Sequence, residues 1–477
     1  MKGLFSSIYL VSRVASAALN LVAIAVFTRL SSREVYGEYL LGFAYGFIAY
    51  SLAIQWLLAA HFGQQTRKHA GRVANTVLVM AATSVGLSLI VIALATGLGL
   101  LRPSVGFGCA AILTGLAVYF VANEIGRAQL RVVPVTIASF LRSGLTLVFG
   151  SIALFLFHTA ESLLLALSLA HIAAAVPIFV VLRKSIWADG FTMPLRQDYL
   201  GIWKYSWPLI LAGGAAAVGT SIDRIVLEGF FGAAKIASYG VMLDFIKQSF
   251  IIVGESVAIS YVSVAKAHHG DGTQGEARDT LKLAFTTTAF LAAFGIVFFL
   301  LLGGPMFKVL LGKDYLGATS LIPWLAAANA CLVLRSYYFA QVIYFSRSVR
   351  LELISTLVAL VASVAFSFWL VPLYDVTGAA MAFTITQVVA LLSILVAPST
   401  RRLMPVDLPR LAIIVVAACG TLAAGMLSAF ALPANMATAV NVVLIALVAG
   451  TLLIRWDMFD ARTISRRLSP FRRRMAG

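Results

Sequence analysis

Apolar runs of about 20 residues recur from one end of this chain to the other, and they constrain its fold more than any other feature. About 20 mostly apolar residues are what a helix needs to cross the hydrocarbon core of a bilayer. Only 12% of the residues are charged, where about 25% is usual in soluble domains. We therefore predict an all-α, polytopic membrane protein without a sizeable extramembrane catalytic domain. Charged and Pro/Gly-rich breaks predict about 14 transmembrane helices, at 5–28, 39–61, 74–100, 105–123, 134–157, 162–182, 205–227, 239–264, 282–303, 317–344, 350–371, 377–397, 411–432 and 436–454.

The lysines and arginines test these spans, because they concentrate on the cytoplasmic loops of membrane proteins. With the N-terminus inside, 25 of the 36 fall on alternate segments, six on the opposite loops and five inside spans. Both termini are therefore expected in the cytoplasm. The net charge of +17 then needs no nucleic-acid partner, since anionic lipid faces those segments. The basic tail is interpreted as a headgroup anchor, with a cytoplasmic protein partner as the alternative.

A polar stretch near the middle of the chain divides the spans into two groups of six. We predict five regions: an N-terminal six-helix lobe at 1–183, a cytoplasmic linker at 184–204, a C-terminal six-helix lobe at 205–398, two additional transmembrane helices at 399–455, and the basic tail at 456–477. A weak sequence similarity relates the two lobes. The segment 27–30 leads to Tyr36-Gly37, and the similar segment 222–225 leads to Tyr239-Gly240. Both leave the membrane on the same side, which favours parallel repeats.

Ionisable side chains inside spans are costly unless they face a bundle interior or water, so each is a candidate functional residue. The eight are Arg13, Arg142, Asp223, Arg224, Asp244, Lys247, Glu255 and Arg335. Five are cations and three are anions, which suggests a ligand that brings negative charge. Phosphate or pyrophosphate suits arginine, whose planar guanidinium binds two such oxygens at once.

Two spans carry polar residues at intervals of three and four, which places them on one helix face. The first stripe is Ser6, Tyr9, Arg13, Ser16 and Asn20, and the second is Ser139, Arg142 or Ser143, and Thr146. Hydrogen bonds between helices explain the small polar residues but not the arginines. We therefore expect Arg13, Asn20 and Arg142 to line a cavity, with Arg142 roughly 12 Å from the cytoplasmic end of its helix.

Asp244, Lys247 and Glu255 share an arc of about 80° on one helix. Asp244 and Lys247 can form an internal pair at i,i+3, whereas Glu255 has no charged neighbour within four residues. The three carboxylates Asp223, Asp244 and Glu255 are candidates for ion or proton coupling.

The other two candidates lie in different surroundings. Asp223 and Arg224 follow the small-residue run 213–219, which allows close helix approach and suggests an interface that slides or opens. Arg335 is flanked by Tyr337 and Tyr338, so it lines a sugar or phosphate path or packs at an interface. Arg224, Lys247 and Arg335 complete the set of cavity candidates.

Nothing in the sequence predicts a catalytic residue, a metal ligand set or a cofactor. The three cysteines are scattered singly through apolar stretches, which is typical of packing residues. His268-His269 lies in a Gly-rich cytoplasmic loop and is interpreted as a solvated turn, while the other histidines are isolated, mostly near span ends. The first 20 residues resemble a secretory signal, but Arg13 interrupts the apolar region and the run continues to Val26, so we predict a span.

Loose motifs in a fixed order carry a resemblance to a known family. They are Ser12-Arg13, 28–31 and 36–39; then 223–227, Phe231-Gly232 and Tyr239-Gly240; then 310–315, Ala318 and 323–325. Over nearly the whole chain this order resembles the polysaccharide transporter family, which includes O-antigen and exopolysaccharide flippases. That family belongs to the multidrug/oligosaccharidyl-lipid/polysaccharide exporter (MOP) superfamily.

The resemblance implies two six-helix lobes around a V-shaped cavity, two further C-terminal helices, and a bacterial inner membrane location. It implies a transporter and not an enzyme, moving undecaprenyl-pyrophosphate-linked oligosaccharide to the periplasmic leaflet by alternating access. Membrane lipids, a polysaccharide polymerase and a chain-length regulator are the implied partners. The alternatives are a lipid II flippase, a drug exporter, which should have an acidic interior, and a glycan polymerase or ligase, which should have a large periplasmic loop.

Overall fold

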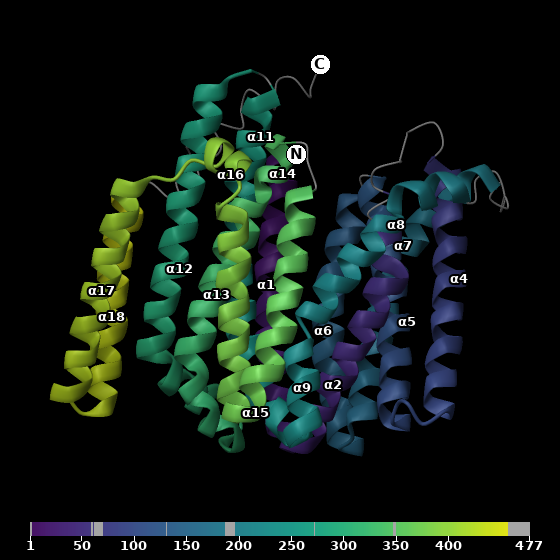
Figure 1. Cartoon of the computed structure of the whole chain (residues 1–477), viewed down its shortest axis with the longest axis horizontal. Helices are drawn as coiled ribbons and strands as arrows, with labels where there is room; N and C mark the ends of the chain where they lie inside the picture. The colour runs from purple at the N-terminus through teal and green to yellow at the C-terminus, as the bar shows by residue number, and fades with distance from the viewer. Residues whose placement is uncertain are drawn as a thin grey trace. The chain divides into compact units, whose positions relative to one another are not determined.

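The computed structural model describes residues 2–58, 61, 70–129, 131–186, 196–270, 272–346 and 350–456. Within these ranges the regular elements are all helical (Figure 1), which confirms the predicted fold class. The elements are α1 (Lys2–Leu30), α2 (Arg33–Tyr50), η1 (Ser51–Gln55), α4 (Ala70–Gly97), α5 (Pro103–Ala128), α6 (Val132–Phe157), α7 (Ala160–Ile186), α8 (Arg196–Gly219), α9 (Ile222–Phe231), α10 (Ala233–Val257), η3 (Ala258–Val262), α11 (Ser263–Gly270), α12 (Gln274–Leu310), η4 (Lys313–Leu321), α13 (Ile322–Tyr337), η5 (Phe339–Val342), α14 (Ile343–Ser346), α15 (Arg350–Leu395), α16 (Pro398–Leu403), α17 (Leu408–Ala431) and α18 (Ala434–Arg455). The side chain of Arg13, the middle of the predicted linker at 187–195 and nearly all of the basic tail lie outside the described residues.

Eleven helical stretches of the described chain are long and apolar enough to cross a membrane, and the end of α8 with α9 makes a twelfth, bent by 44°. Helix α15 is interrupted at Asp375, whose φ of 55° and ψ of −131° depart from helical values. This interruption falls between the predicted spans 350–371 and 377–397, so α15 accounts for two of them. With α1 the count approaches the 14 predicted spans.

The surfaces of the outer helices are those of a protein surrounded by lipid. Leu87 and Val91 of α4 are 65% and 63% exposed, and Leu427 and Phe430 of α17 are 69% and 93% exposed. A soluble protein seldom leaves apolar faces of this extent uncovered. Helices satisfy their own backbone hydrogen bonds and so tolerate hydrocarbon on such faces. The chain is therefore a multi-pass membrane protein.

Packing divides the chain into two compact units. Unit 1 comprises Met1–Val241, Leu311–Tyr315 and Ser363–Ala379. Within it, α6 packs against α1 and α7, and α5 packs against α2, α4 and α7. Glycines allow these helices to approach closely: a Cβ on Gly115 of α5 would lie 2.7 Å from the Cα of Ser168 on α7. Small residues at helix contacts are the usual means of tight packing within membranes.

Unit 2 comprises Met242–Leu310, Leu316–Ala362 and Ala380–Gly477. The long helix α12 packs against α11, α13, α17 and α18. Figure 1 shows α17 and α18 side by side next to α12. Ser428 of α17 donates a hydrogen bond to Asn441 of α18 at 2.9 Å, which joins the two helices through polar side chains. The boundaries of the predicted lobes and tail, and the cavity between the lobes, stay predictions.

The predicted span 205–227 is not one straight helix. Helix α8 ends at Gly219 and α9 begins at Ile222, directly after the small-residue run. The carbonyl of Gly219, which the break releases from the helix ladder, accepts a hydrogen bond from the Ser363 hydroxyl at 2.8 Å. The small residues do permit close approach, because a Cβ on Gly214 would lie 2.4 Å from Cδ2 of Leu52.

Candidate functional site

Arg142 occupies a polar cluster inside unit 1. Its guanidinium carbon lies 5.7 Å from the centroid of the Tyr119 ring on α5, within the range of a cation–π interaction. Its Nη2 atom donates to the hydroxyl of Ser143 at 3.4 Å. The Tyr119 ring in turn meets the imidazole of His171 on α7 edge to face, at 5.6 Å. Helices α5, α6 and α7 therefore each place an aromatic or cationic group at this point.

The polar stripe of α1 meets the polar stripe of α6 at the same cluster. The hydroxyl of Ser16 donates to the backbone carbonyl of Ser139 at 3.3 Å, and the Tyr119 hydroxyl donates to the Ser139 hydroxyl at 3.3 Å. Asn20 lies one turn further along α1 and is half-buried, while Arg13 lies about one turn before Ser16. We call Ser16, Tyr119, Ser139, Arg142, Ser143 and His171 the Arg142 cluster.

The charge of Arg142 is not neutralised within the described part of the chain. Among the described side chains, no carboxylate lies within 4.0 Å of its guanidinium. A cation inside a membrane protein is costly unless it meets an anion or water. The half-buried guanidinium, with the Ser143 hydroxyl and the Tyr119 ring beside it, is therefore suited to bind an oxyanion such as phosphate.

Sequence reasoning missed two members of this cluster. His171 was interpreted as isolated, but it lies in the middle of α7, is 5% exposed, and donates through Nδ1 to the Leu167 carbonyl at 2.7 Å. Tyr119 was not singled out at all. The available signal was a histidine deep inside the predicted span 162–182, since a polar ring there needs a partner.

Asp223 and Arg224 lie in a second cluster of unit 1, and both are almost fully buried, at 3% and 8% exposure. The Tyr239 hydroxyl donates to Oδ2 of Asp223. The backbone N–H of Arg224 donates to Oδ1 of the same carboxylate at 2.8 Å. Asp223 therefore holds α9 against α10, which is a structural use of a residue that we proposed for ion or proton coupling.

Glycines bring all three groups of family-like motifs together around Asp223. A Cβ on Gly37 would lie 1.8 Å from the Ala233 carbonyl oxygen, and one on Gly240 would lie 2.5 Å from Leu40 Cδ1. One on Gly312 would lie 2.7 Å from the Thr28 carbonyl oxygen. The two similar segments, 27–37 and 222–240, therefore pack against each other at these glycines. We call Thr28, Tyr36, Gly37, Asp223, Arg224, Tyr239, Gly240, Gly312 and Tyr315 the motif cluster.

Aromatic contacts and an ion pair add to the packing around the motif cluster in unit 1. The Tyr36 and Tyr315 rings meet edge to face at 6.1 Å, and the Tyr315 hydroxyl donates to the Ser32 carbonyl at 3.5 Å. Lys235, in the first turn of α10, pairs with Asp375 at the interruption of α15. Such solvent-facing ion pairs contribute about 0–1 kcal/mol each, so the glycine contacts and buried tyrosines dominate this packing.

The remaining candidates lie in unit 2. Arg335 pairs with Glu352 of α15, with Nη2 and Oε1 3.2 Å apart and side chains 14% and 33% exposed. This pairing favours helix packing over a ligand path at Arg335. Asp244, Lys247 and Glu255 are half-buried on α10, and the Asp244–Lys247 pair stays a prediction.

The histidine cluster is not the solvated turn that we predicted. His268 and His269 form the last turn of α11, and Nδ1 of His268 lies 3.0 Å from Oε2 of Glu276. Among the described residues, no group of three or more histidine, cysteine, aspartate or glutamate side chains could hold a metal ion. The cysteines Cys109, Cys331 and Cys419 are unpaired thiols.

Comparison of sequences gives one relative and no family model. No model of a protein family matches the chain. The chain is 24% identical over 186 residues to the capsular polysaccharide biosynthesis protein CapF of Staphylococcus aureus. This match covers 39% of the chain and 46% of CapF, so the chain spans less than half the length of that relative.

Comparison of structures shows the fold. The lipid II flippase MurJ in an inward closed conformation matches with a TM-score of 0.72 and 14% identity, over 95% of this chain and 99% of that one. An inward-facing MATE multidrug resistance transporter of the MOP superfamily has a TM-score of 0.56 and 16% identity, over 81% and 96%. A MOP superfamily transporter from Pyrococcus furiosus has a TM-score of 0.55 and 16% identity, over 82% and 93%.

This chain therefore has the fold that these transporters share, in agreement with the fold that the resemblance in the sequence motifs implies. The proteins that share the fold are transporters and not enzymes, and the sequence relative belongs to polysaccharide biosynthesis.

Proposed function

We propose that this chain is a flippase that moves undecaprenyl-pyrophosphate-linked oligosaccharide across the bacterial inner membrane during polysaccharide biosynthesis. One observation carries the proposal: Arg142 lies inside the helix bundle without a carboxylate within ion-pair distance among the described side chains. A substrate with a pyrophosphate would supply the missing negative charge. The similarity to CapF supports polysaccharide as the cargo, and the fold supports transport.

The Arg142 cluster suits the pyrophosphate more than the sugars. The guanidinium presents paired N–H donors to phosphate oxygens, and the Ser143 hydroxyl lies beside it. Arg13 and Asn20 extend the same polar face along α1, so they would continue the path. Transport then needs only alternating access, with both termini in the cytoplasm, and no covalent chemistry.

Two other substrates remain as alternatives within the same superfamily. Lipid II also carries a pyrophosphate, so the Arg142 cluster would suit it equally well. A drug exporter for organic cations is less favoured, because it should present carboxylates where this chain presents Arg142. A polysaccharide polymerase and a chain-length regulator would act on the exported product and are the proposed protein partners.

The decisive experiment measures which lipid-linked glycan becomes trapped in the cytoplasmic leaflet when the protein is absent. Cells with the gene deleted and restored are compared, and the leaflet accessibility of the oligosaccharide lipid and of lipid II is measured in each. We expect only the oligosaccharide lipid to accumulate inside. Trapping of lipid II instead would assign the alternative substrate, and normal flipping with unpolymerised glycan outside would contradict transport altogether.

The carboxylates of α10 give a test of energy coupling. If proton binding to Glu255 or Asp244 drives the cycle, Glu255→Gln or Asp244→Asn should abolish transport driven by a proton gradient. Normal gradient-driven transport by both variants would exclude these residues from coupling.

A further inference from the structure

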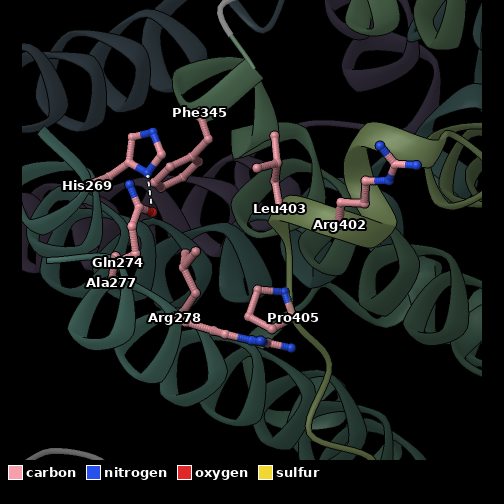
Figure 2. A pocket seen from close by; sticks show the side chains of 9 residues that line it. His269, Gln274, Ala277, Arg278, Phe345, Arg402, Leu403 and Pro405 are labelled. Atoms are coloured by element: carbon pink, nitrogen blue, oxygen red, sulfur yellow. Dashed lines mark hydrogen bonds between the residues drawn. The ribbon is translucent and has the colours of Figure 1, made fainter. Parts of the chain in front are cut away.

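Unit 2 contains a polar pocket that belongs to neither the Arg142 cluster nor the motif cluster. Its volume is about 200 Å³, and it opens where α11 ends and α12 begins (Figure 2). Helices α12 and α16 and the segment after α16 form its walls. The lining residues are His269, Gln274, Ala277, Arg278, Leu281, Phe345, Arg402, Leu403 and Pro405. The space exceeds that of several waters, which take about 30 Å³ each in the liquid.

The rim of this pocket is cationic. Arg278 and Arg402 are both exposed, and within the described part of the chain neither has an ion-pair or hydrogen-bond partner. By contrast, the neighbouring Arg401 donates to the Leu395 carbonyl at 3.1 Å. None of the lining residues is acidic. Both arginines line the pocket with donors that the protein does not use, but they extend differently: in Figure 2 the Arg278 guanidinium lies beside Pro405, whereas the Arg402 guanidinium points away from the other lining side chains.

The acidic side chains adjacent in sequence are each engaged elsewhere. Glu276 lies 3.0 Å from Nδ1 of His268, and Asp279 lies 3.7 Å from Lys282. Asp407 caps α17 and lies 3.5 Å from Arg410. Among the described neighbours, these three carboxylates therefore pair with other basic side chains and not with Arg278 or Arg402.

The inner wall of the pocket is apolar and ordered by one hydrogen bond. Leu281 and Phe345 are 3% and 8% exposed, and the imidazole of His269 meets the Phe345 ring edge to face at 5.4 Å. Nδ1 of His269 donates to Oε1 of Gln274 at 3.0 Å, which Figure 2 shows as a dashed line. This bond leaves the amide NH₂ of Gln274 as a donor for a ligand.

We propose that this pocket binds a phosphate ester through Arg278 and the amide of Gln274, with Arg402 as a second cation at its rim. Two arginines and an amide supply charged and neutral donors for phosphate oxygens, while the apolar wall accepts the carbon groups attached to the ester. Basic pockets between transmembrane helices are suited to anionic lipid headgroups. A bound phosphate would connect the ends of α11, α12 and α16. This inference does not depend on the transported substrate.

Native mass spectrometry of the detergent-purified full chain tests the site. Phosphatidylglycerol and zwitterionic phosphatidylcholine are titrated separately, and inorganic phosphate is added as a soluble competitor. The pocket variant is Arg278→Gln with Arg402→Gln. The matched control is Arg350→Gln with Arg455→Gln, which removes two exposed arginines of unit 2 that do not line the pocket.

We expect wild type and the control to bind phosphatidylglycerol in preference to phosphatidylcholine, and the pocket variant to bind it about tenfold more weakly. Competition by inorganic phosphate would show that the phosphate alone is recognised. Protection from thermal unfolding by inorganic phosphate without lipid binding would assign a soluble phosphate to the same pocket. If the pocket variant is unstable, the single substitution Arg278→Gln at an exposed position of α12 replaces it.

Three results would overturn the proposal. The first is wild-type lipid binding by the folded pocket variant, and the second is equal loss in the pocket and control variants, which would indicate general charge attraction. The third is a wild-type protein that binds neither phosphatidylglycerol nor inorganic phosphate.

Discussion

Two arginines of unit 1, Arg224 and Arg142, occupy opposite kinds of surroundings. Arg224 is 8% exposed and lies in the motif cluster, where its guanidinium carbon is 3.8 Å from the Cβ position of Gly240. It directly follows Asp223, whose carboxylate accepts the Arg224 backbone N–H. Arg142 is half-buried and lies over an aromatic ring, with no carboxylate within 4.0 Å among the described side chains.

The two arginines therefore differ in role: Arg224 stabilises the fold, whereas Arg142 is available to bind an anion. A buried cation beside a carboxylate and tightly packed glycines is part of the fold, and removing it should weaken the fold. A half-buried cation without an anion is held at a cost to stability, and a protein tolerates such a cost where function requires it. The comparison therefore predicts opposite effects of substitution at the two positions.

The largest effect is expected at Gly37. Gly37→Val would place carbon atoms against the Ala233 carbonyl, because even a Cβ would lie 1.8 Å from its oxygen. We expect a loss of about 3 kcal/mol or more, seen as loss of folded protein in the membrane fraction. Gly144→Val is the control, since nothing lies within 4 Å of a Cβ at that position. Equal accumulation of both variants would show that the motif cluster is not tightly packed.

The next largest effect should distinguish the arginines themselves. Arg224→Met should lower the unfolding free energy by about 1–3 kcal/mol, because it removes a buried polar side chain from the motif cluster. The thermal midpoint of the purified variant in detergent measures this loss. A midpoint equal to that of wild type would remove the distinction drawn between the two clusters.

Arg142→Met is expected to have the opposite sign. Replacing an uncompensated cation in the bundle by an apolar side chain of similar length should leave the thermal midpoint unchanged or raise it. The same thermal unfolding assay measures the midpoint. A marked decrease would mean that Arg142 has a structural partner, and the cluster would then resemble that of Arg224.

The smallest loss of stability among the motif-cluster variants is expected from Tyr239→Phe. This change removes the hydroxyl that donates to Asp223 and keeps the ring. The expected loss is about 1–2 kcal/mol, the magnitude for a hydrogen bond to a charged group. Transport should persist, which would separate the packing role of the motif cluster from substrate binding at Arg142.

Regular patterns in the sequence predicted the membrane helices well. The positions of 134–157 and 162–182 lie within α6 and α7 to within a few residues, because the apolar length of a span is fixed by the bilayer. The break after Gly219 was not predicted, since the run 213–219 continues a plausible helix. Its partner, the Ser363 hydroxyl, is distant in sequence.

The candidate site was predicted only where residues repeat along one helix. The intervals on α1 and α6 placed Ser16 and Arg142 on polar faces, and the structure brings those faces together. Tyr119 and His171 join them from other helices, so no local pattern could indicate their contact. The contact of Gly37 with Ala233 is likewise tertiary. The sequence similarity between segments 27–37 and 222–240 singled out both segments but not their contact.

Transport by reconstituted protein tests the central claim most directly. Proteoliposomes with wild type, Arg142→Gln, Arg142→Lys and the exposed control Arg131→Gln would be assayed for flipping of labelled undecaprenyl-pyrophosphate-linked oligosaccharide. We predict wild-type rates for Arg131→Gln, partial activity for Arg142→Lys, and at least a tenfold lower rate for Arg142→Gln, about the effect of one lost charge-assisted contact. Wild-type flipping by folded Arg142→Gln would contradict the claim that this arginine receives the substrate's negative charge.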